Sequence, residues 1–131
     1  MMTKEQYISY WINTAAQDWD AVETLFAAGL YTHCLFWAHL ALEKLAKAHW
    51  VKNHEDNIPP KVHNIVWLLE ESEVDLGKEM MAFLANLNEF QLTSRYPDYL
   101  GKMYHICTRD FTVSIVENAK EIRTCLLKML Q

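Results

Sequence analysis

The stretch that decides the fold is GLYTHCLFWAHLALEKLAKAHW, residues 29–50, which contains no helix breaker after its first residue. One stripe of small and apolar side chains recurs in it at steps of four and three, formed by Cys34, Ala38, Ala41, Leu45 and Ala48. A second set widens this stripe around the helix: Leu35, Phe36, Trp37, Leu40 and Leu42. A helix that is apolar on several sides needs several packing partners. We therefore expect a helix over about Tyr31–His54 at the centre of a bundle. Its apolar surface is also suited to contact with another subunit.

Two further segments, one at the start and one at the end of the chain, show the same helical spacing of apolar residues. Thr3 and Gln6 have the spacing of a capping box, which predicts the start of a first helix. Gly29 lies where a helix commonly ends in the left-handed conformation, so we expect a turn there. The last helix is predicted by a further run of apolar residues at the same spacing: Ile115, Ala119, Ile122, Leu126 and Met129.

The middle of the chain predicts two more helices and one loop. Pro59 and Pro60 cannot continue the second helix, and a short third helix is expected over about Lys61–Glu71. A fourth helix is expected over about Val74–Gln91, where apolar residues again follow steps of four and three. The residues near 92–104 show no such pattern and are expected to form an irregular loop.

The composition favours a helical fold and argues against one class of function. The chain has 131 residues, 51% of them hydrophobic, and its three Gly and three Pro are too few for a sandwich or barrel. We therefore predict a single all-α domain over residues 1–131, an antiparallel up-and-down helical bundle of four long helices plus one short helix. The net charge of −5 argues against a general polyanion binder, although a local basic pocket is compatible with it.

Several classes of protein are disfavoured. Cys34, Cys107 and Cys125 are odd in number and widely spaced, so they predict reduced thiols in the core instead of a disulfide framework or a zinc site. His33 and His39 are six positions apart, which does not place both on one helical face. We expect no metal and no cofactor. No secretory or membrane-spanning apolar run occurs, so we expect a cytoplasmic protein without a membrane contact.

Three motifs in order resemble the HEPN domain family: residues 29–50, the stretch PPKVHNIVWLL at 59–69, and SRYPDY at 94–99. The first follows the family's pattern of Gly, any residue, Tyr, and then an apolar helix that ends in Ala, any residue, Glu-Lys and a later Lys. The likeness covers nearly the whole chain. It implies a helical bundle, often dimeric, that is frequently encoded beside or fused to a minimal nucleotidyltransferase. Such proteins are nucleotide- or RNA-binding modules or metal-independent ribonucleases that act as toxins.

The ribonuclease members of this family have an Arg followed, after four to six residues, by a His. Arg95 matches the arginine, but residues 100–102 hold Leu, Gly and Lys, and the first histidine is His105, after nine intervening residues. Toxin members also place a Tyr just beyond the His, whereas Tyr104 precedes it here. A long loop can still bring Arg95 and His105 together as cation and proton-transfer group, so the resemblance leaves open whether the chain is an endoribonuclease.

The loop stretch itself suggests a ligand site. Arg95 has the fork geometry for a phosphate, and Tyr96 and Tyr99 beside it can stack on a base. The alternative is a structural turn, because Pro97 favours a turn and Asp98 can cap a neighbouring amide.

Three further residues are candidates for ligand binding. His63 follows two prolines at the start of a helix, where its ring can touch a phosphate, although it can equally cap or pack. Glu43 and Lys47 have the spacing of a helical ion pair, which as a solvated pair contributes only a few tenths of a kcal/mol. The alternative is that Glu43 or Lys44 lies beside Arg95 in a polar pocket.

These observations lead to three hypotheses. The first is a homodimeric HEPN-type module that binds a nucleotide or RNA, or a minimal nucleotidyltransferase partner in a toxin–antitoxin-like system, through a surface around Arg95. The second is a metal-independent ribonuclease toxin that uses Arg95 and His105. The third is a protein-interaction module without a ligand. The sequence does not decide which nucleotide or RNA is bound, or whether a partner modifies Tyr99 or Tyr104.

Overall fold

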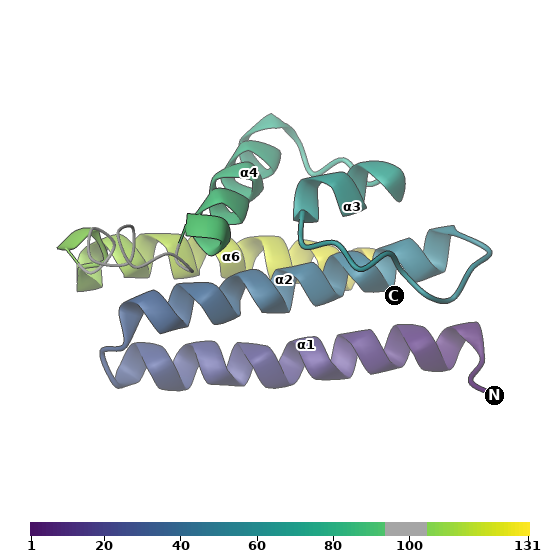
Figure 1. Ribbon diagram of the computed structural model, residues 1–131, viewed down its shortest axis with the longest axis horizontal. Coiled ribbons are helices and arrows are strands. Elements are labelled where there is room, and N and C mark those ends of the chain that lie inside the picture. Colours follow the sequence, from purple (N-terminus) through teal and green to yellow (C-terminus); the bar gives the residue numbers. More distant parts are fainter. Residues whose placement is uncertain (94–104) are drawn as a thin grey trace.

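The computed structural model describes residues 1–93 and 105–131, and this part of the chain contains five helices and no strand. The helices are α1 (Lys4–Ala27), α2 (Tyr31–Asn53), α3 (Ile65–Glu71), α4 (Lys78–Thr93) and α6 (Arg109–Met129). Figure 1 shows α1 and α2 antiparallel, α4 crossing back obliquely, and α6 running in the same direction as α2. The predicted all-α bundle of four long helices and one short helix is confirmed.

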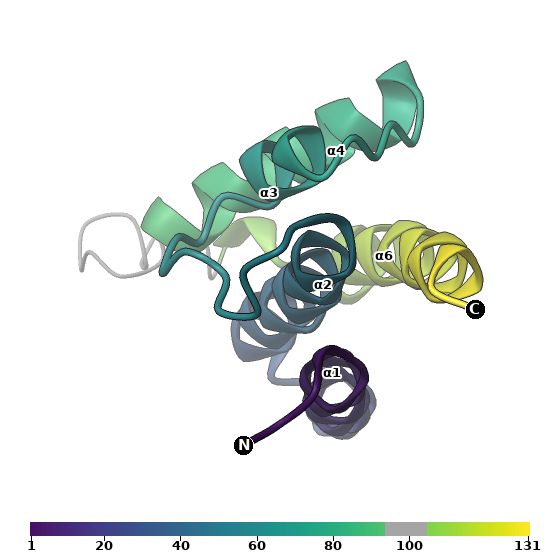
Figure 2. The same ribbon diagram turned by 90° about the vertical axis from the view of Figure 1, so that its right-hand side faces the viewer.

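Helix α2 is the centre of the bundle, as its apolar pattern predicts. It contacts each of the other four helices, and in the end-on view of Figure 2 it lies between α1, α6 and the pair formed by α3 and α4. Leu35, Leu42 and Leu45 are almost completely removed from solvent. Burying a leucine contributes about 1.5–3 kcal/mol relative to exposing it, so α2 holds much of the energy of the core.

The ends of α1 follow the local signals in the sequence. The hydroxyl of Thr3 accepts a hydrogen bond from the backbone N–H of Gln6, and the side chain of Gln6 accepts one from the N–H of Thr3. After α1, Gly29 has φ +75°, a left-handed conformation in which a side chain would be strained. The N–H of Leu30 donates to the carbonyl of Leu25, so the chain reverses directly into α2.

Helix α3 begins later than the predicted Lys61. Asn64 has an extended backbone, and its Oδ1 accepts a hydrogen bond from the N–H of Trp67 at 3.1 Å. This is the geometry of a helix N-cap, so the first helical residue is Ile65.

Helix α4 also begins later than predicted, at Lys78 instead of Val74. Gly77 has φ +93°, which a right-handed helix does not contain. The carboxylate of Asp75 accepts a hydrogen bond from the N–H of Gly77 at 2.9 Å. This local turn forms in place of a first helical turn. The apolar spacing in the sequence runs through the turn, so the spacing alone does not reveal where the helix begins.

The last turn of α2 is fastened to both ends of the chain. The ammonium of Lys4 donates to three acceptors around that turn, namely Val51 O at 2.8 Å, His54 O at 2.6 Å and Asn57 Oδ1 at 2.8 Å. On the side of α6, Lys52 Nζ donates to Met129 O at 2.8 Å, and His49 Nε2 donates to Leu126 O at 2.9 Å. These contacts satisfy carbonyl groups that helix ends leave without partners.

Two of the three cysteines lie in the core as predicted. Cys34 and Cys107 are buried, Cys125 is partly buried, and all three are free thiols. Burial raises the pKa of Cys34 to about 11 and also raises the pKa of Cys107. These two thiols therefore remain protonated and unreactive at neutral pH.

Candidate functional site

The sequence-predicted loop site is only partly within the described residues. Arg95, Tyr96 and Tyr99 lie outside them, as does Tyr104, so their proposed roles stay predictions. His105 is described and is exposed, shortly before α6. The remaining candidates lie on α2 and in the segment that leads into α3.

Glu43 lies at the centre of a buried polar cluster on α2. Its Oε2 is 3.2 Å from Lys47 Nζ and its Oε1 is 3.0 Å from His63 Nδ1, while its side chain is only 5% exposed. The predicted pair between Glu43 and Lys47 forms, but the expectation that it is solvated is wrong, because Lys47 is buried as well. His63, arriving from the loop before α3, covers the carboxylate and completes its hydrogen bonds.

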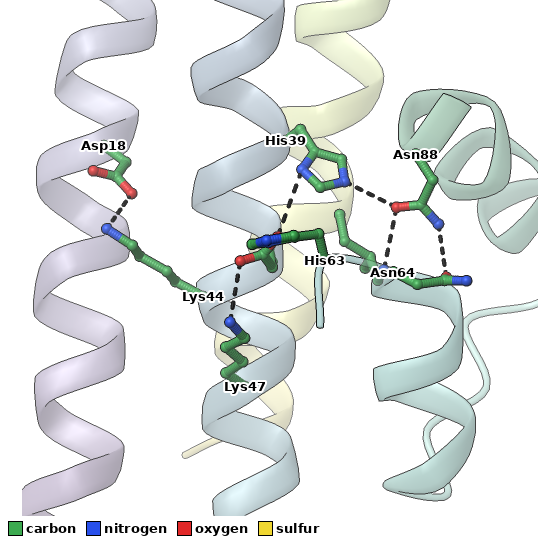
Figure 3. Close-up of polar contacts among 9 residues, drawn as sticks. Asp18, His39, Lys44, Lys47, His63, Asn64 and Asn88 are labelled. Carbon is green, nitrogen blue, oxygen red and sulfur yellow. Dashed lines mark hydrogen bonds and ion pairs between the residues drawn. The ribbon is translucent and has the colours of Figure 1, made fainter. Parts of the chain in front are cut away.

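The cluster continues from α2 to α4 through His39. His39 Nδ1 lies 3.9 Å from Glu43 Oε1, and its Nε2 lies 2.9 Å from Asn88 Oδ1. Asn88 Oδ1 also accepts from the N–H of Ile65 at 3.2 Å, while Asn88 Nδ2 donates to Asn64 Oδ1 at 2.8 Å (Figure 3). Since Asn88 Oδ1 acts as the acceptor, His39 Nε2 carries the proton in this contact. Asn88 was not predicted, because a single polar residue on a helix has no distinctive pattern.

Lys44 faces a different side of α2 from this cluster. Its Nζ forms an ion pair with Asp18 of α1 at 2.7 Å, and Figure 3 shows the side chain reaching toward α1. The structure therefore brings Glu43 and His63 together and leaves Lys44 apart from them.

A pocket of about 290 Å³ adjoins the cluster at Lys47. Aromatic and proline side chains from α1 and the loop after α2 form most of its wall, together with two lysines: Tyr7, Tyr10, Trp11, Pro59, Pro60, Lys47 and Lys61. Lys47 Nζ lies 5.5 Å from the centre of the Trp11 ring, a cation–π distance. Lys47 thus separates an aromatic pocket from the Glu43–His63 pair. Sequence reasoning missed this pocket because these aromatic residues share the apolar spacing of a core.

The chemical capacity of the cluster lies in His63. A carboxylate only accepts hydrogen bonds, so Nδ1 of His63 donates to Glu43, and the side chain of His63 is 53% exposed. A histidine held in this way can exchange a proton at its other nitrogen. Among the described residues, no group of three or more His, Cys, Asp or Glu side chains has an arrangement that would hold a metal ion.

The fold and this cluster define a helical bundle with a polar site built on its central helix. A model of the HEPN domain matches residues 8–130, which is nearly the whole chain, and the chain therefore belongs to the HEPN domain family. At the level of the family this is a nucleotide- or RNA-related module. Neither the curated proteins nor the solved structures contain a significant match. No helix in residues 1–93 and 105–131 is both long and apolar enough to cross a bilayer.

Proposed function

We propose that this protein is a nucleotide- or RNA-binding module that works as a homodimer with a minimal nucleotidyltransferase partner in a toxin–antitoxin-like system. The observation that carries the proposal is the match to the HEPN domain over residues 8–130. The stretch with Arg95, Tyr96 and Tyr99 supplies a guanidinium group for a phosphate and two rings for a base.

The polar cluster supports the same proposal from the described part of the chain. The ring of His63 is half-exposed, so a ligand can reach it, and Glu43 contributes by orienting this ring. Lys44 is 26% exposed, but its ion pair with Asp18 at 2.7 Å neutralises its charge, so it would have to leave Asp18 to bind a ligand phosphate.

A metal-independent ribonuclease that uses Arg95 and His105 is the second candidate. The observation in its favour is that His105 is exposed and therefore accessible to a substrate. The long separation of Arg95 and His105 in the sequence is the observation against it.

Binding is tested by fluorescence anisotropy with labelled short single-stranded RNA and with labelled ATP. We expect the wild type to bind one of these ligands and Arg95→Ala to bind it at least about tenfold more weakly, since a hydrogen bond to a charged group contributes about 1.5–3 kcal/mol. Arg123→Ala, on α6, is the matched control and should bind as the wild type does. Wild-type protein that is folded by circular dichroism and binds neither ligand would refute the proposal.

The assembly is tested separately by light scattering during size-exclusion chromatography. We expect the mass of two chains for the protein alone, and a shift to a larger mass when a minimal nucleotidyltransferase partner is added. A single-chain mass at micromolar concentration would remove the homodimer from the proposal.

A further inference from the structure

We infer that the aromatic pocket beside Lys47 binds a small aromatic monocarboxylate. The ring of this ligand packs against Tyr10 and Trp11, and its carboxylate accepts hydrogen bonds from Lys47 and Lys61. The inference goes beyond the proposed function, because such a ligand is neither a nucleotide nor RNA.

The wall of the pocket suits one aromatic ring system. Its volume of about 290 Å³ lies at the small end of the range for ligand pockets, about 300–1,000 Å³. The rings of Tyr10 and Trp11 in this wall meet edge to face, with their centroids 5.4 Å apart, so they present two aromatic surfaces at different angles. Tyr10 is 52% exposed, and Ile58 from the loop after α2 is 56% exposed. Large apolar side chains left exposed around a hollow are typical of a binding site.

Lys47 places unused hydrogen-bond donors at this wall. The residue is only 8% exposed, and its ammonium group carries three N–H donors. Among the described residues, only Glu43 Oε2 accepts a hydrogen bond from it, at 3.2 Å. Its Nζ lies 5.5 Å from the centre of the Trp11 ring, which places the ammonium beside the aromatic wall. A buried ammonium is stabilised by further acceptors, and a ligand oxygen supplies one while the contact with Glu43 remains.

Trp11 contributes a second donor. Its indole N–H is enclosed by protein atoms and has no hydrogen-bond partner in the described part of the chain. An enclosed donor without an acceptor is unfavourable. A small movement of the pocket wall that admits a ligand oxygen to this N–H removes that cost.

The charge of the lining selects an anion with a single negative charge. The charged residues that line the pocket are Lys47 and Lys61, both of them cations. Glu43 balances Lys47, whereas Lys61 is exposed and forms no ion pair within residues 1–93 and 105–131. One uncompensated cation matches the single charge of a carboxylate better than the two charges of a phosphate monoester. A carboxylate also accepts hydrogen bonds from ammonium and indole donors alike.

The test is an NMR titration of isotope-labelled protein with naphthoate, followed through the indole N–H resonances. Naphthamide is the uncharged analogue of the same shape. We expect naphthoate to shift the Trp11 resonance with a Kd of about 1 mM or tighter, which is ordinary for a ligand of this size. Naphthamide should bind at least about tenfold more weakly, since hydrogen bonds to charged groups are the stronger ones. Trp67 on α3 is exposed outside the pocket, so its resonance should not move.

Three variants locate the ligand by calorimetry, each checked for its fold by circular dichroism. Tyr10→Ala removes an exposed ring, so we expect the bundle to stay folded and naphthoate to bind at least about tenfold more weakly. Lys61→Met should weaken naphthoate by about threefold and leave naphthamide unchanged, because its contribution is an exposed charge. Trp67→Phe is the matched control and should bind as the wild type does.

Three results would overturn the inference. Equal affinity for naphthoate and naphthamide would show that the pocket does not recognise a carboxylate. Absence of binding up to about 10 mM, or shifts that leave the Trp11 resonance in place, would remove the ligand from this pocket. Adenosine monophosphate is titrated in parallel, and displacement of naphthoate by a tighter-binding nucleotide would assign the pocket to the proposed function instead. None of these results alters the anisotropy measurement with RNA and ATP, so the inference and the proposed function fail separately.

Discussion

Replacing Glu43 by Gln removes one negative charge from the core and keeps the shape of the side chain. The change weakens two hydrogen bonds to basic groups, to Lys47 at 3.2 Å and to His63 at 3.0 Å. The Lys47 side chain, 10% exposed, keeps its charge without a counter-charge, and removing one partner of a buried pair costs about 3–5 kcal/mol. His63 is half-exposed and can bind water instead, so weakening its hydrogen bond to Glu43 lowers the free energy of unfolding only slightly. Because the amide oxygen of Gln still accepts a hydrogen bond from Lys47, we expect the free energy of unfolding to fall by about 3 kcal/mol, the low end of the range.

The assay is urea unfolding followed by circular dichroism, in a double-mutant cycle of Glu43→Gln and Lys47→Met. The double variant removes both charges, so we expect it to be more stable than the sum of the single effects by about 2 kcal/mol. Glu117→Gln, an exposed carboxylate on α6, is the control and should change the stability by less than about 0.5 kcal/mol. A cost below about 1 kcal/mol for Glu43→Gln, with additive single effects, would show that the pair behaves as a surface ion pair and would refute the reasoning.

Three further predictions concern the ends of α2 and the core. Burial, together with the nearby Lys52, lowers the pKa of His49 below its ordinary 6.5 and outweighs its hydrogen bond to a backbone carbonyl, which acts in the opposite direction. The unfolded chain therefore binds more protons just below that pH, so the free energy of unfolding should fall as the pH drops below about 6.5, and urea titrations of His49→Gln should lose this slope. Lys4→Met should cost about 1–3 kcal/mol and speed hydrogen exchange at the last turn of α2, since one charged donor to three acceptors is lost. Thiol labelling at pH 8, mapped by mass spectrometry, should modify Cys125 first, because Cys34 is buried with a pKa of about 11; rapid labelling of Cys34 in the folded protein would contradict this burial.

The parts of the fold that were predictable depend on neighbours in the sequence. The stripe along α2 predicts a central helix, and the pair of Thr3 and Gln6 predicts the first N-terminus, because both patterns act within one or two helical turns. The turn at Gly29 was predictable for the same reason, since a chain reversal after α1 needs a residue that accepts a positive φ. The structure agrees with the sequence at each of these points.

The start of α3 was predicted too early because Pro60 suits the first turn of a helix, and the start of α4 because the apolar spacing begins before the real boundary. Asn64 ends the extended segment by capping α3, and it is held there by Asn88 from a different helix. Gly77 and Asp75 form a turn that interrupts the spacing before α4. The contact of Asn64 with Asn88 joins residues far apart in the sequence, so a window of neighbouring residues does not reveal it.

The candidate site shows the same limit. The spacing of Glu43 and Lys47 is identical for a solvated pair and for a buried one. The difference comes from residues distant in the sequence, since His63 lies against the carboxylate and the Trp11 ring lies beside Lys47. The charge pattern therefore predicts the contact but not its burial. The roles of Arg95 and the tyrosines beside it stay predictions, since those residues lie outside the described part of the chain.

The attachment of both chain ends to the last turn of α2 makes their detachment cooperative. Lys4 holds the start of α1 to that turn, and Lys52 holds the end of α6 to it. When one end frays, the turn loses a hydrogen-bond partner and becomes easier to unwind, which weakens the hold on the other end. Two segments at opposite extremes of the sequence thus depend on the same helical turn for part of their hydrogen bonding. A molecule that binds preferentially to the frayed form of either end would therefore release the other.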